Sequence, residues 1–362
     1  MTKKIVFVVS TLDSGGVENY LLRFLRFFNN KIQPIVICRG DYLGELEEEY
    51  RKISQIEIVK MDLSKFDFNS NRSLYFFLKD SKADSIVDFS GHFSGIIIFI
   101  AKLAGIKRRI VFYRESTYQF ELNFFKTLYI NFSKTLVTSF STKILSNSIA
   151  ALDFFHATRN RNSQKFSVIY NGIDFEIGDK KFSKEDFSIP ENAFVIGHTG
   201  RYNFAKNHGT IIKVAENICK KYNDVYFVLC GKNTDVELLE TVSKSRVLKD
   251  KVKLLGYRDD VNSILPIFDL FFFPSITEGQ PNSLIEAMIA GLPIVASNIK
   301  TILETTPLEL HKDLIDPLDF SAFSDAIEKY YLGELKRNSG LSDWAEKKFS
   351  AKILFQEFFD EL

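Results

Sequence analysis

Two glutamates, Glu278 and Glu286, lie on either side of a short turn in the segment ITEGQPNSLIEAMIAGLPIVAS, residues 276–297. The apolar run DLFFFPS before it is typical of a strand, and LIEAMIA after it is typical of a short helix. A carboxylate in such a turn can accept hydrogen bonds from sugar hydroxyls. A structural alternative is a Ser-x-x-Glu capping box made by Ser283 and Glu286 at the helix start, in which Glu278 has no part.

Two cations follow an earlier strand-like run, in the segment GHTGRYNFAKNHG. Arg201 and Lys206 lie on one loop that leads into a helical pattern. The forked donors of an arginine and the point charge of a lysine, near the positive end of a helix, would hold a diphosphate well. The alternative is a solvated loop whose charges bind no ligand.

Two further turns carry residues that could bind a ligand. Gly15 and Gly16 separate the first strand-like run from an amphipathic helix, and backbone N–H groups at that helix end favour a phosphate or a sugar hydroxyl. The dinucleotide fingerprint Gly-x-Gly-x-x-Gly is missing there, which argues against NAD. His92 lies in the turn DFSGHFSG. A lone histidine can be structural, but its glycine and serine neighbours make a catalytic role equally plausible.

These turns are placed by short apolar runs that alternate with amphipathic stretches. In the first half the runs are KIVFVVS, PIVIC, IEIVK, SIVDF, RIVFY and KFSVIY; after residue 190 they are FVIGHTG, VYFVLCG, KVKLLG, DLFFFPS and LPIVAS. Continuous apolar runs indicate strands buried on both faces, as in parallel sheets covered by helices. We therefore expect an α/β fold with two doubly wound domains, whose ligands bind outside the carboxyl ends of the strands.

Length and composition agree with two folded domains. The chain has 362 residues, of which 45% are hydrophobic and 26% charged. The boundary is expected between residues 172 and 192, where periodicity is lost and Gly, Asp, Lys and Pro gather. Three widely spaced cysteines suit a reducing compartment and form no metal cluster. Without a signal-peptide pattern or a run of about 20 apolar residues, the expected location is the cytoplasm.

The net charge of +1 hides an asymmetry between the two halves. Residues 1–180 carry a net +6 and the remainder a net −5. Residues 102–165 alone hold 11 Lys and Arg, 3 Asp and Glu, and 11 Phe and Tyr. Such a surface can attach peripherally to the anionic inner face of a membrane. The alternative is that the aromatic residues are core and the cations a solvated face. No nucleic-acid recognition motif accompanies the charge, so no nucleic-acid partner is expected.

Nearly the whole chain resembles the retaining glycosyltransferases of family 4, also called glycosyl transferases group 1. The most specific segment is FDLFFFPSITEGQPNSLIEAMIAGLPIVAS, which is similar to the family's Pro-Ser, Glu-Gly, Glu-Ala and Gly-x-Pro pattern. IYNGID, the Gly-Arg pair with Lys206 after it, and the opening GGVE match as well. The resemblance implies the GT-B arrangement of two Rossmann-like domains facing a cleft, here residues 1–177 for the acceptor and 178–340 for the sugar nucleotide. A C-terminal segment, 341–362, would cross back to the first domain.

The resemblance also implies roles for individual residues. Glu286 would bind the ribose hydroxyls and Glu278 the donor sugar, while Arg201 and Lys206 would neutralise the diphosphate leaving group. His92 would contact the donor sugar near the reacting carbon. With His92, Arg201, Lys206 and Glu278 as the catalytic set, the implied nucleotide-sugar site comprises Gly15, Gly16, Arg201, Lys206, Glu278, Gly279, Pro281, Asn282, Ser283, Leu284 and Glu286.

The expected activity is transfer of a sugar, with retention and without a metal or other cofactor, from a UDP-sugar to a saccharide acceptor that is lipid-linked. The product would enter a bacterial capsule, exopolysaccharide or lipopolysaccharide. No Asp-x-Asp and no His/Cys cluster with ligand spacing occurs in the sequence. Family glycines are missing from residues 298–316, so the loop there is expected to differ. The alternatives are a sugar-nucleotide epimerase or phosphorylase of the same fold, and a sugar-binding protein without activity.

Overall fold

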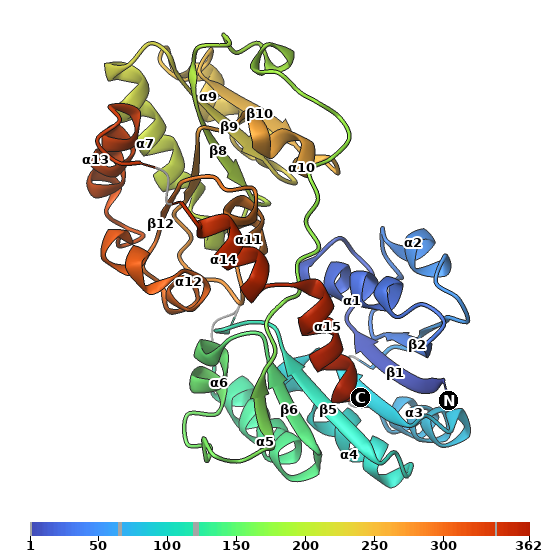
Figure 1. Cartoon of the computed structure of the whole chain (residues 1–362). Helices are drawn as coiled ribbons and strands as arrows, with labels where there is room; N and C mark the ends of the chain where they lie inside the picture. Colours follow the sequence, from blue (N-terminus) through green and yellow to red (C-terminus); the bar gives the residue numbers. More distant parts are fainter. Residues whose placement is uncertain (1, 64–66, 119–122, 337–338) are drawn as a thin grey trace. The chain divides into compact units, whose positions relative to one another are not determined.

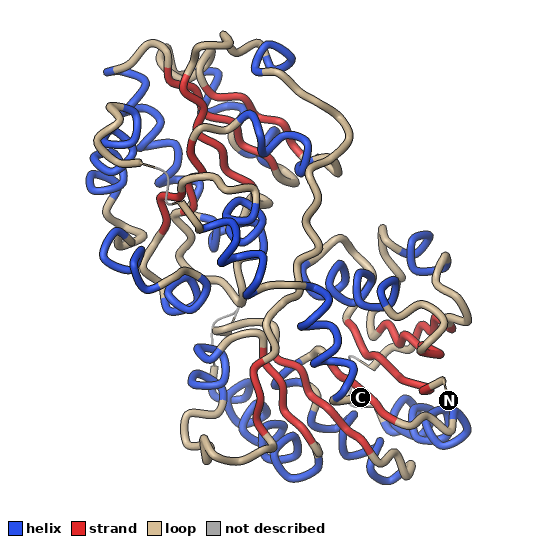
Figure 2. Tube along the Cα trace, in the orientation of Figure 1, coloured by secondary structure: helices blue, strands red, loops and turns tan. Residues whose placement is uncertain are grey.

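In the computed structural model, which describes residues 2–63, 67–118, 123–336 and 339–362, every strand pairs in parallel with its neighbours. The chain forms two units, coloured along the sequence in Figure 1. The first comprises Met1–Gly172 with Ala351–Leu362, and the second comprises Ile173–Ser350. Each unit contains one parallel sheet, drawn in red in Figure 2, between layers of helices.

The sheet of the first unit has the strand order β3-β2-β1-β4-β5-β6-β7. Its strands are β1 (Lys3–Val9), β2 (Ile32–Cys38), β3 (Glu57–Lys60), β4 (Ser85–Asp88), β5 (Arg108–Tyr113), β6 (Lys143–Ser146) and β7 (Phe166–Val168). Its helices are α1 (Gly16–Phe27), α2 (Glu47–Arg51), α3 (Phe68–Ser81), the 3-10 turn η1 (Gly91–Phe93), α4 (Gly95–Leu103), α5 (Phe124–Phe140), α6 (Ile149–Phe155) and α15 (Ala351–Asp360).

Alternate residues of β1 show why this sheet needs two helical layers. Phe7 and Val9 belong to a buried cluster with α1, α2 and α15, whereas Val6 and Val8 belong to a second cluster with α3, α4, α5 and α6. Because successive side chains of a strand point to opposite faces, a strand that is apolar throughout must be covered on both sides.

The sheet of the second unit has the order β10-β9-β8-β11-β12. Its strands are β8 (Phe194–Thr199), β9 (Val225–Cys230), β10 (Val252–Gly256), β11 (Leu270–Phe273) and β12 (Ile294–Ala296). Its helices are α7 (His208–Lys221), α8 (Thr234–Glu237), α9 (Leu239–Lys244), α10 (Val261–Ile264), α11 (Asn282–Ile289), α12 (Lys300–Thr305), α13 (Phe320–Tyr331) and α14 (Leu341–Lys348), with 3-10 turns η2 (Lys184–Phe187), η3 (Phe204–Lys206), η4 (Leu265–Ile267) and η5 (Leu308–Asp313). One face packs against α7 and α13, and α11 contacts β11 and β12.

The expected fold class, two doubly wound parallel-sheet domains, is confirmed. All strand-like runs named from the sequence form strands, but β6 was not among them. This strand is only the short run Lys143–Ser146, directly after the long helix α5, so it lacks a separate apolar signal. Residues 298–316, where family glycines are missing, form α12 and η5, after which Ile315 bridges to Ser297.

The chain leaves the first unit after Gly172, before the expected boundary at 177/178, and returns to it only at Ala351. The prediction that all of 341–362 packs on the first unit was therefore too broad, because α14 belongs to the second unit and contacts α11. At the crossing, Ile173 pairs with Ser350, and a Cβ on Gly172 would lie 2.7 Å from the Cα of Ala351. Glycine is required there because the two chain segments pass so closely.

Helix α15 completes the core of the first unit. The ring of Phe358 lies 4.7 Å from that of Phe24 and 5.3 Å from that of Phe112, measured between centroids. The ring centroids of Phe355 and Tyr20 lie 5.6 Å apart. The end of the helix is held where Arg108 donates a 2.8 Å hydrogen bond to the Leu362 carbonyl. None of the helices in the described ranges is long and apolar enough to span a membrane.

Phe358→Ala should lower the free energy of unfolding of the first unit by about 3–5 kcal/mol, because it leaves a cavity under α15. Urea unfolding followed by far-UV circular dichroism measures the change. Ile353→Ala is the matched control, since Ile353 lies on the same helix with its side chain exposed. Equal stability of the two variants would show that α15 does not stabilise this core.

Candidate functional site

The strand order of each sheet reverses at one point, and the predicted site residues follow the strands there. In the second unit the reversal lies between the neighbouring strands β8 and β11. Arg201 and Lys206 follow β8, and Glu278 follows β11. The two loops are joined because the Ile276 N–H donates to the Ala205 carbonyl at 2.8 Å. Such reversal points are where open α/β sheets bind ligands.

Lys206 and Glu278 form an ion pair that is mostly shielded from solvent. The Lys206 Nζ donates to Glu278 Oε1 at 2.7 Å, and the side chains are only 14% and 11% exposed. The same Nζ lies 4.7 Å from the centroid of the Phe273 ring. The structure therefore brings together the two residues predicted for diphosphate and sugar. Since each ion already satisfies the other, an incoming diphosphate has to compete with Glu278 for Lys206.

Arg201 differs from Lys206 in being exposed, and it makes no ion pair within the described parts of the chain. Its backbone is nevertheless fixed, because the Gly200 N–H donates to the Cys230 carbonyl at 2.8 Å. Gly231, at φ +155°, lies so close that a Cβ there would come 2.1 Å from the Gly200 oxygen. This glycine is thus needed for the loops after β8 and β9 to pack together.

Helix α11 does not begin with the capping box considered from the sequence. Its N-cap residue is Pro281, without a side-chain capping bond, and Ser283 is already inside the helix. The structural alternative for Glu286 was therefore wrong, and Glu286 lies half-buried in the second turn. The helix directly follows the loop that carries Glu278, so the positive end of the helix lies at that loop, although the Asn282 N–H already donates to the Gln280 carbonyl at 3.1 Å.

The remaining predicted residues of this segment differ in what they can reach. Gly279, Asn282 and Ser283 are half-buried, whereas Pro281 and Leu284 are buried. The Leu284 side chain is fully buried and its N–H donates to the Pro281 carbonyl at 3.1 Å. Leu284 therefore anchors α11 in the core rather than presenting a polar group.

The reversal in the first unit lies between β1 and β4, and Gly15, Gly16 and His92 follow these strands. Gly15 is the N-cap of α1, where a Cβ would come 2.4 Å from Glu18 Oε2. Around Gly16 a Cβ would meet no atom within 4 Å. Gly15 thus makes room for the Glu18 carboxylate, while Gly16 leaves the start of the helix open.

His92 is buried among aromatic rings. Its ring centroid lies 5.1 Å from that of Tyr118 and 5.5 Å from that of Phe155. Burial, with a smaller contribution from Lys134, lowers the pKa of His92 to about 4. The imidazole is therefore neutral at pH 7 and can act there only as a hydrogen-bonding group.

Two polar residues of these edges were missed from the sequence. Asn207 donates through Nδ2 to the carbonyls of Pro274, at 3.0 Å, and Pro317, at 2.7 Å, and so ties the Lys206 loop to β11. Arg114 follows β5 as a buried cation. A charged residue directly after the apolar run RIVFY was the available signal. Among the described residues, no group of three or more His, Cys, Asp or Glu could hold a metal ion.

Comparison with known proteins agrees with this architecture. Residues 14–177 match the model of Glycosyltransferase Family 4, and residues 179–347 match that of Glycosyl transferases group 1. The capsular polysaccharide biosynthesis glycosyltransferase CapH of Staphylococcus aureus is 28% identical over 82% of this chain and 82% of its own. A UDP-Gal:alpha-D-GlcNAc-diphosphoundecaprenol alpha-1,3-galactosyltransferase of Escherichia coli is 32% identical over 45% of this chain and 44% of its own.

A solved structure shows the same fold. The crystal structure of Anabaena Alr3699/HepE in complex with UDP has a TM-score of 0.80 at 18% identity, covering 99% of both chains. The two parallel sheets and the shared fold define a GT-B protein. The chain belongs to the glycosyl transferases group 1 family. Within the chain, the family 4 domain comes first and the group 1 domain follows it.

Glu278→Gln should tighten the binding of UDP about three- to tenfold, a change on the order of 1 kcal/mol, because Lys206 loses its competing carboxylate. Isothermal titration calorimetry with UDP measures the effect. The matched control is Glu240→Gln, which removes the same charge from the exposed pair of Glu240 with Lys244. Unchanged or weaker UDP binding by Glu278→Gln would contradict the competition.

Proposed function

We propose that this glycosyltransferase transfers a sugar with retention from a UDP-sugar to a lipid-linked saccharide acceptor in bacterial surface polysaccharide synthesis. The observation that carries the proposal is the pairing of Lys206 with Glu278 beside Arg201, where the second sheet reverses its strand order. The relatives support it, because CapH is named for capsular polysaccharide and the Escherichia coli enzyme for UDP-Gal and a diphosphoundecaprenol-linked acceptor.

The second unit holds the donor in this proposal. Arg201, Lys206 and the positive end of α11 bind the diphosphate, Glu286 binds the ribose hydroxyls, and Glu278 binds the sugar. When the diphosphate takes Lys206, the released Glu278 carboxylate accepts hydrogen bonds from the sugar hydroxyls. The two cations stabilise the charge that develops on the leaving group, so the reaction needs no metal ion. Turnover is then expected to persist in excess EDTA.

The reaction forms the bond between the acceptor oxygen and the anomeric carbon, and it breaks the bond between that carbon and the phosphate oxygen. The acceptor hydroxyl attacks on the face from which the diphosphate leaves, and a phosphate oxygen takes its proton. No protein nucleophile is required. His92, neutral at pH 7, serves as a hydrogen-bonding group for the donor sugar.

Glu286→Ala should weaken UDP binding about tenfold or more, because the ribose loses a charge-assisted hydrogen bond. Arg201→Ala should instead lower kcat about 100-fold with a smaller change in UDP affinity, because it acts on the developing charge. Calorimetry with UDP and a nucleotide-release assay measure the two effects.

Matched controls for these variants are Glu240→Ala and Arg246→Ala, which remove exposed charges from the same unit. Unaltered UDP affinity and turnover in both test variants would overturn the assignment. A new sugar-nucleotide isomer, seen by NMR with donor alone, would favour the epimerase. Absence of nucleotide release with every acceptor tried would favour a binding protein. An inverted anomeric centre in the product would exclude retention.

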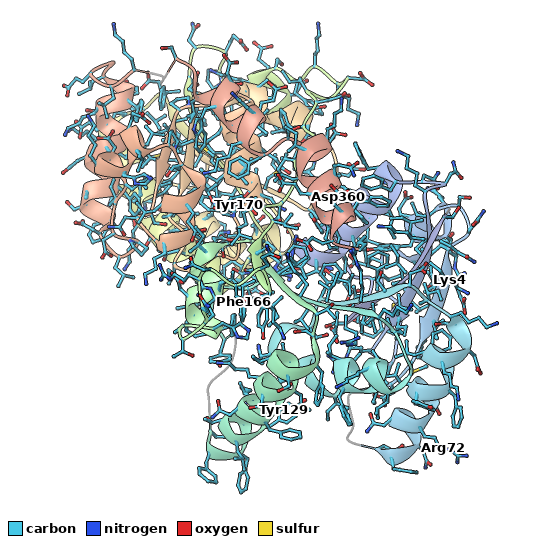
Figure 3. All side chains as sticks on the ribbon, turned by 60° about the horizontal axis from the view of Figure 1, so that its bottom comes forward. Lys4, Arg72, Tyr129, Phe166, Tyr170 and Asp360 are labelled. Carbon is cyan, nitrogen blue, oxygen red and sulfur yellow. The ribbon has the colours of Figure 1, made fainter. Side chains whose placement is uncertain are left out.

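We further propose that the first unit attaches to an anionic membrane surface through α5. Phe124, Phe125, Leu128 and Phe132 are 77%, 78%, 61% and 54% exposed, on the helix that carries the labelled Tyr129 in Figure 3. Phe124, Leu128 and Phe132 are spaced four residues apart and so share one face of the helix. Exposed aromatic residues on a basic helix suit the interfacial region of a bilayer. Residues 119–122 of the segment 102–165 lie outside the described residues.

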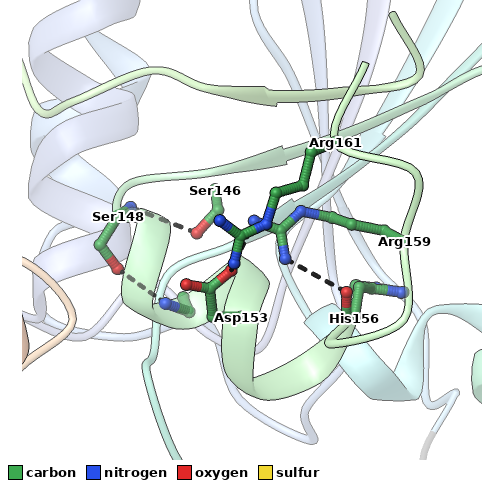
Figure 4. Close-up of polar contacts among 7 residues, drawn as sticks. Ser146, Ser148, Asp153, His156, Arg159 and Arg161 are labelled. Carbon is green, nitrogen blue, oxygen red and sulfur yellow. Dashed lines mark hydrogen bonds and ion pairs between the residues drawn. The ribbon is translucent and has the colours of Figure 1, made fainter. Parts of the chain in front are cut away.

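The segment 102–165 contains further basic residues after α6, of which Arg161 has an exposed side chain and Arg159 a buried one. Figure 4 shows Arg159 and Arg161 turned toward one carboxylate, that of Asp153, at 2.7 and 3.3 Å. Arg159 also donates to the His156 carbonyl at 3.2 Å. Since two cations share one anion, a positive charge remains on this loop for an anionic headgroup.

Phe124→Ser with Phe125→Ser should lower co-sedimentation with phosphatidylglycerol vesicles about tenfold or more, because two inserting rings are lost. The control is Phe68→Ser with Phe76→Ser, since these rings are exposed on α3 of the same unit. Binding to wild type should fall with added salt. Equal losses in the two double variants, or no vesicle binding by wild type at any salt concentration, would overturn the membrane proposal.

A further inference from the structure

Arg114 is a cation buried at the carboxyl edge of the first sheet, outside the set of residues assigned above. It directly follows β5, which lies between β4 and β6. Its strand end therefore shares an edge with the reversal point between β1 and β4. Only 9% of Arg114 is exposed. A guanidinium so placed has lost most of its water and needs another source of stabilisation.

Aromatic rings, rather than an acid, surround this guanidinium. Its Cζ lies 3.9 Å from the centroid of the Tyr20 ring and 4.9 Å from that of Phe112. Burial lowers the pKa of Arg114 to about 10, while Tyr20 and Glu18 oppose the decrease. The group is thus fully charged at pH 7. Within the described residues, no carboxylate comes within ion-pair distance of it.

Several buried polar atoms at this edge have no hydrogen-bond partner in the described parts of the chain, among them Tyr20 Oη and Asp88 Oδ2, and two of them belong to Arg114 and its neighbour. One is Arg114 Nη1, and the other is Oδ1 of Asn147, the first residue after β6. The two residues are neighbours, because Asn147 Nδ2 donates to the Arg114 carbonyl at 3.5 Å. An unsatisfied buried polar group costs roughly 1–3 kcal/mol. Apolar side chains would avoid that cost, so a polar ligand at this edge accounts for both residues.

The chemistry of Arg114 selects an anion as that ligand. A planar guanidinium presents paired N–H donors that match phosphate oxygens, and the rings on which it packs fix its orientation. The donor's diphosphate already has Arg201 and Lys206 in the second unit. A cation in the first unit therefore serves a second phosphate, and the acceptor named for the Escherichia coli relative contains a diphosphate between sugar and lipid.

We propose that Arg114 binds the phosphate through which the acceptor sugar is joined to its lipid carrier. The inference rests on the function proposed above and adds a substrate class, the sugar diphospholipids, together with the residue that recognises it. The Asn147 oxygen then accepts a hydrogen bond from a hydroxyl of the same ligand.

The test is calorimetric titration of the full chain with farnesyl diphosphate, a soluble diphosphate with a short prenyl chain, with and without saturating UDP. Wild type should bind it in both conditions, because UDP occupies only the second unit. Arg114→Gln should weaken the binding about tenfold or more, as expected for loss of hydrogen bonds to a charged group. Arg114→Lys should weaken the binding less, because lysine keeps the positive charge but lacks the paired N–H donors of the guanidinium.

Several controls separate this site from other effects of the substitution. Arg72→Gln removes a cation packed on a ring, that of Phe76 at 5.6 Å, from the exposed side of α3 (Figure 3) and should leave the binding unchanged. Thermal unfolding monitors folding, and Arg114→Lys keeps the test valid if Arg114→Gln does not fold. UDP affinity should be unchanged in both Arg114 variants.

Equal affinity of wild type and both Arg114 variants for farnesyl diphosphate would overturn the proposal, as would no binding to wild type. Equally tight, Arg114-dependent binding of inorganic pyrophosphate would identify a site for free anions and would also overturn it. Failure of wild type to bind UDP would instead count against the proposed function, while the Arg114 comparison in the absence of UDP would still stand.

Discussion

The parallel direction of the strands is the constraint on which the rest of this structure depends. Because neighbouring strands within each described sheet run the same way, all of their carboxyl ends meet at one edge. The inner strands, such as β1, β4, β8 and β11, are buried along most of their length, so polar groups reach the surface mainly at their ends. Residues 72 positions apart, such as Lys206 and Glu278, come into contact there because β8 and β11 are neighbours. Loops closed by glycine, as at Gly231, keep that edge tightly packed.

The two edges stabilise a buried cation in different ways. In the second unit Lys206 is neutralised by Glu278, so the site is electrically balanced until a ligand arrives. In the first unit Arg114 rests on the rings of Tyr20 and Phe112, which stabilise the charge without cancelling it. A balanced pair favours exchange of partners, whereas a cation on aromatic rings remains attractive to an anion. In the proposed function, this contrast fits a donor site that must release the nucleotide after transfer and an acceptor site that must hold a phosphate.

The sequence predicted the fold well because each buried strand is a continuous apolar run, and β6 was missed because it is short and directly follows a helix. Local pattern alone did not show the start of α11, because a Ser-x-x-Glu pattern suggested Ser283 as the N-cap, whereas the N-cap is Pro281. Nor could it show that Lys206 pairs with Glu278, because that contact depends on strand order. Arg114 escaped notice for a related reason. It lies in no glycine turn or helix start, and its burial follows from α1 packing above β5.

The return of the chain to the first unit through α15 has a consequence for the order of synthesis. Tyr20, Phe24 and Phe112 are translated early, yet the rings of Phe355 and Phe358 that cover them follow the entire second unit. During synthesis on the ribosome, the apolar face of the first unit therefore remains uncovered until α15 has been made. The second unit, which is continuous in sequence, can fold before that. Domains usually fold in the order of their synthesis. Here the unit that begins first is completed last, and its exposed rings are a natural target for chaperones in the interval.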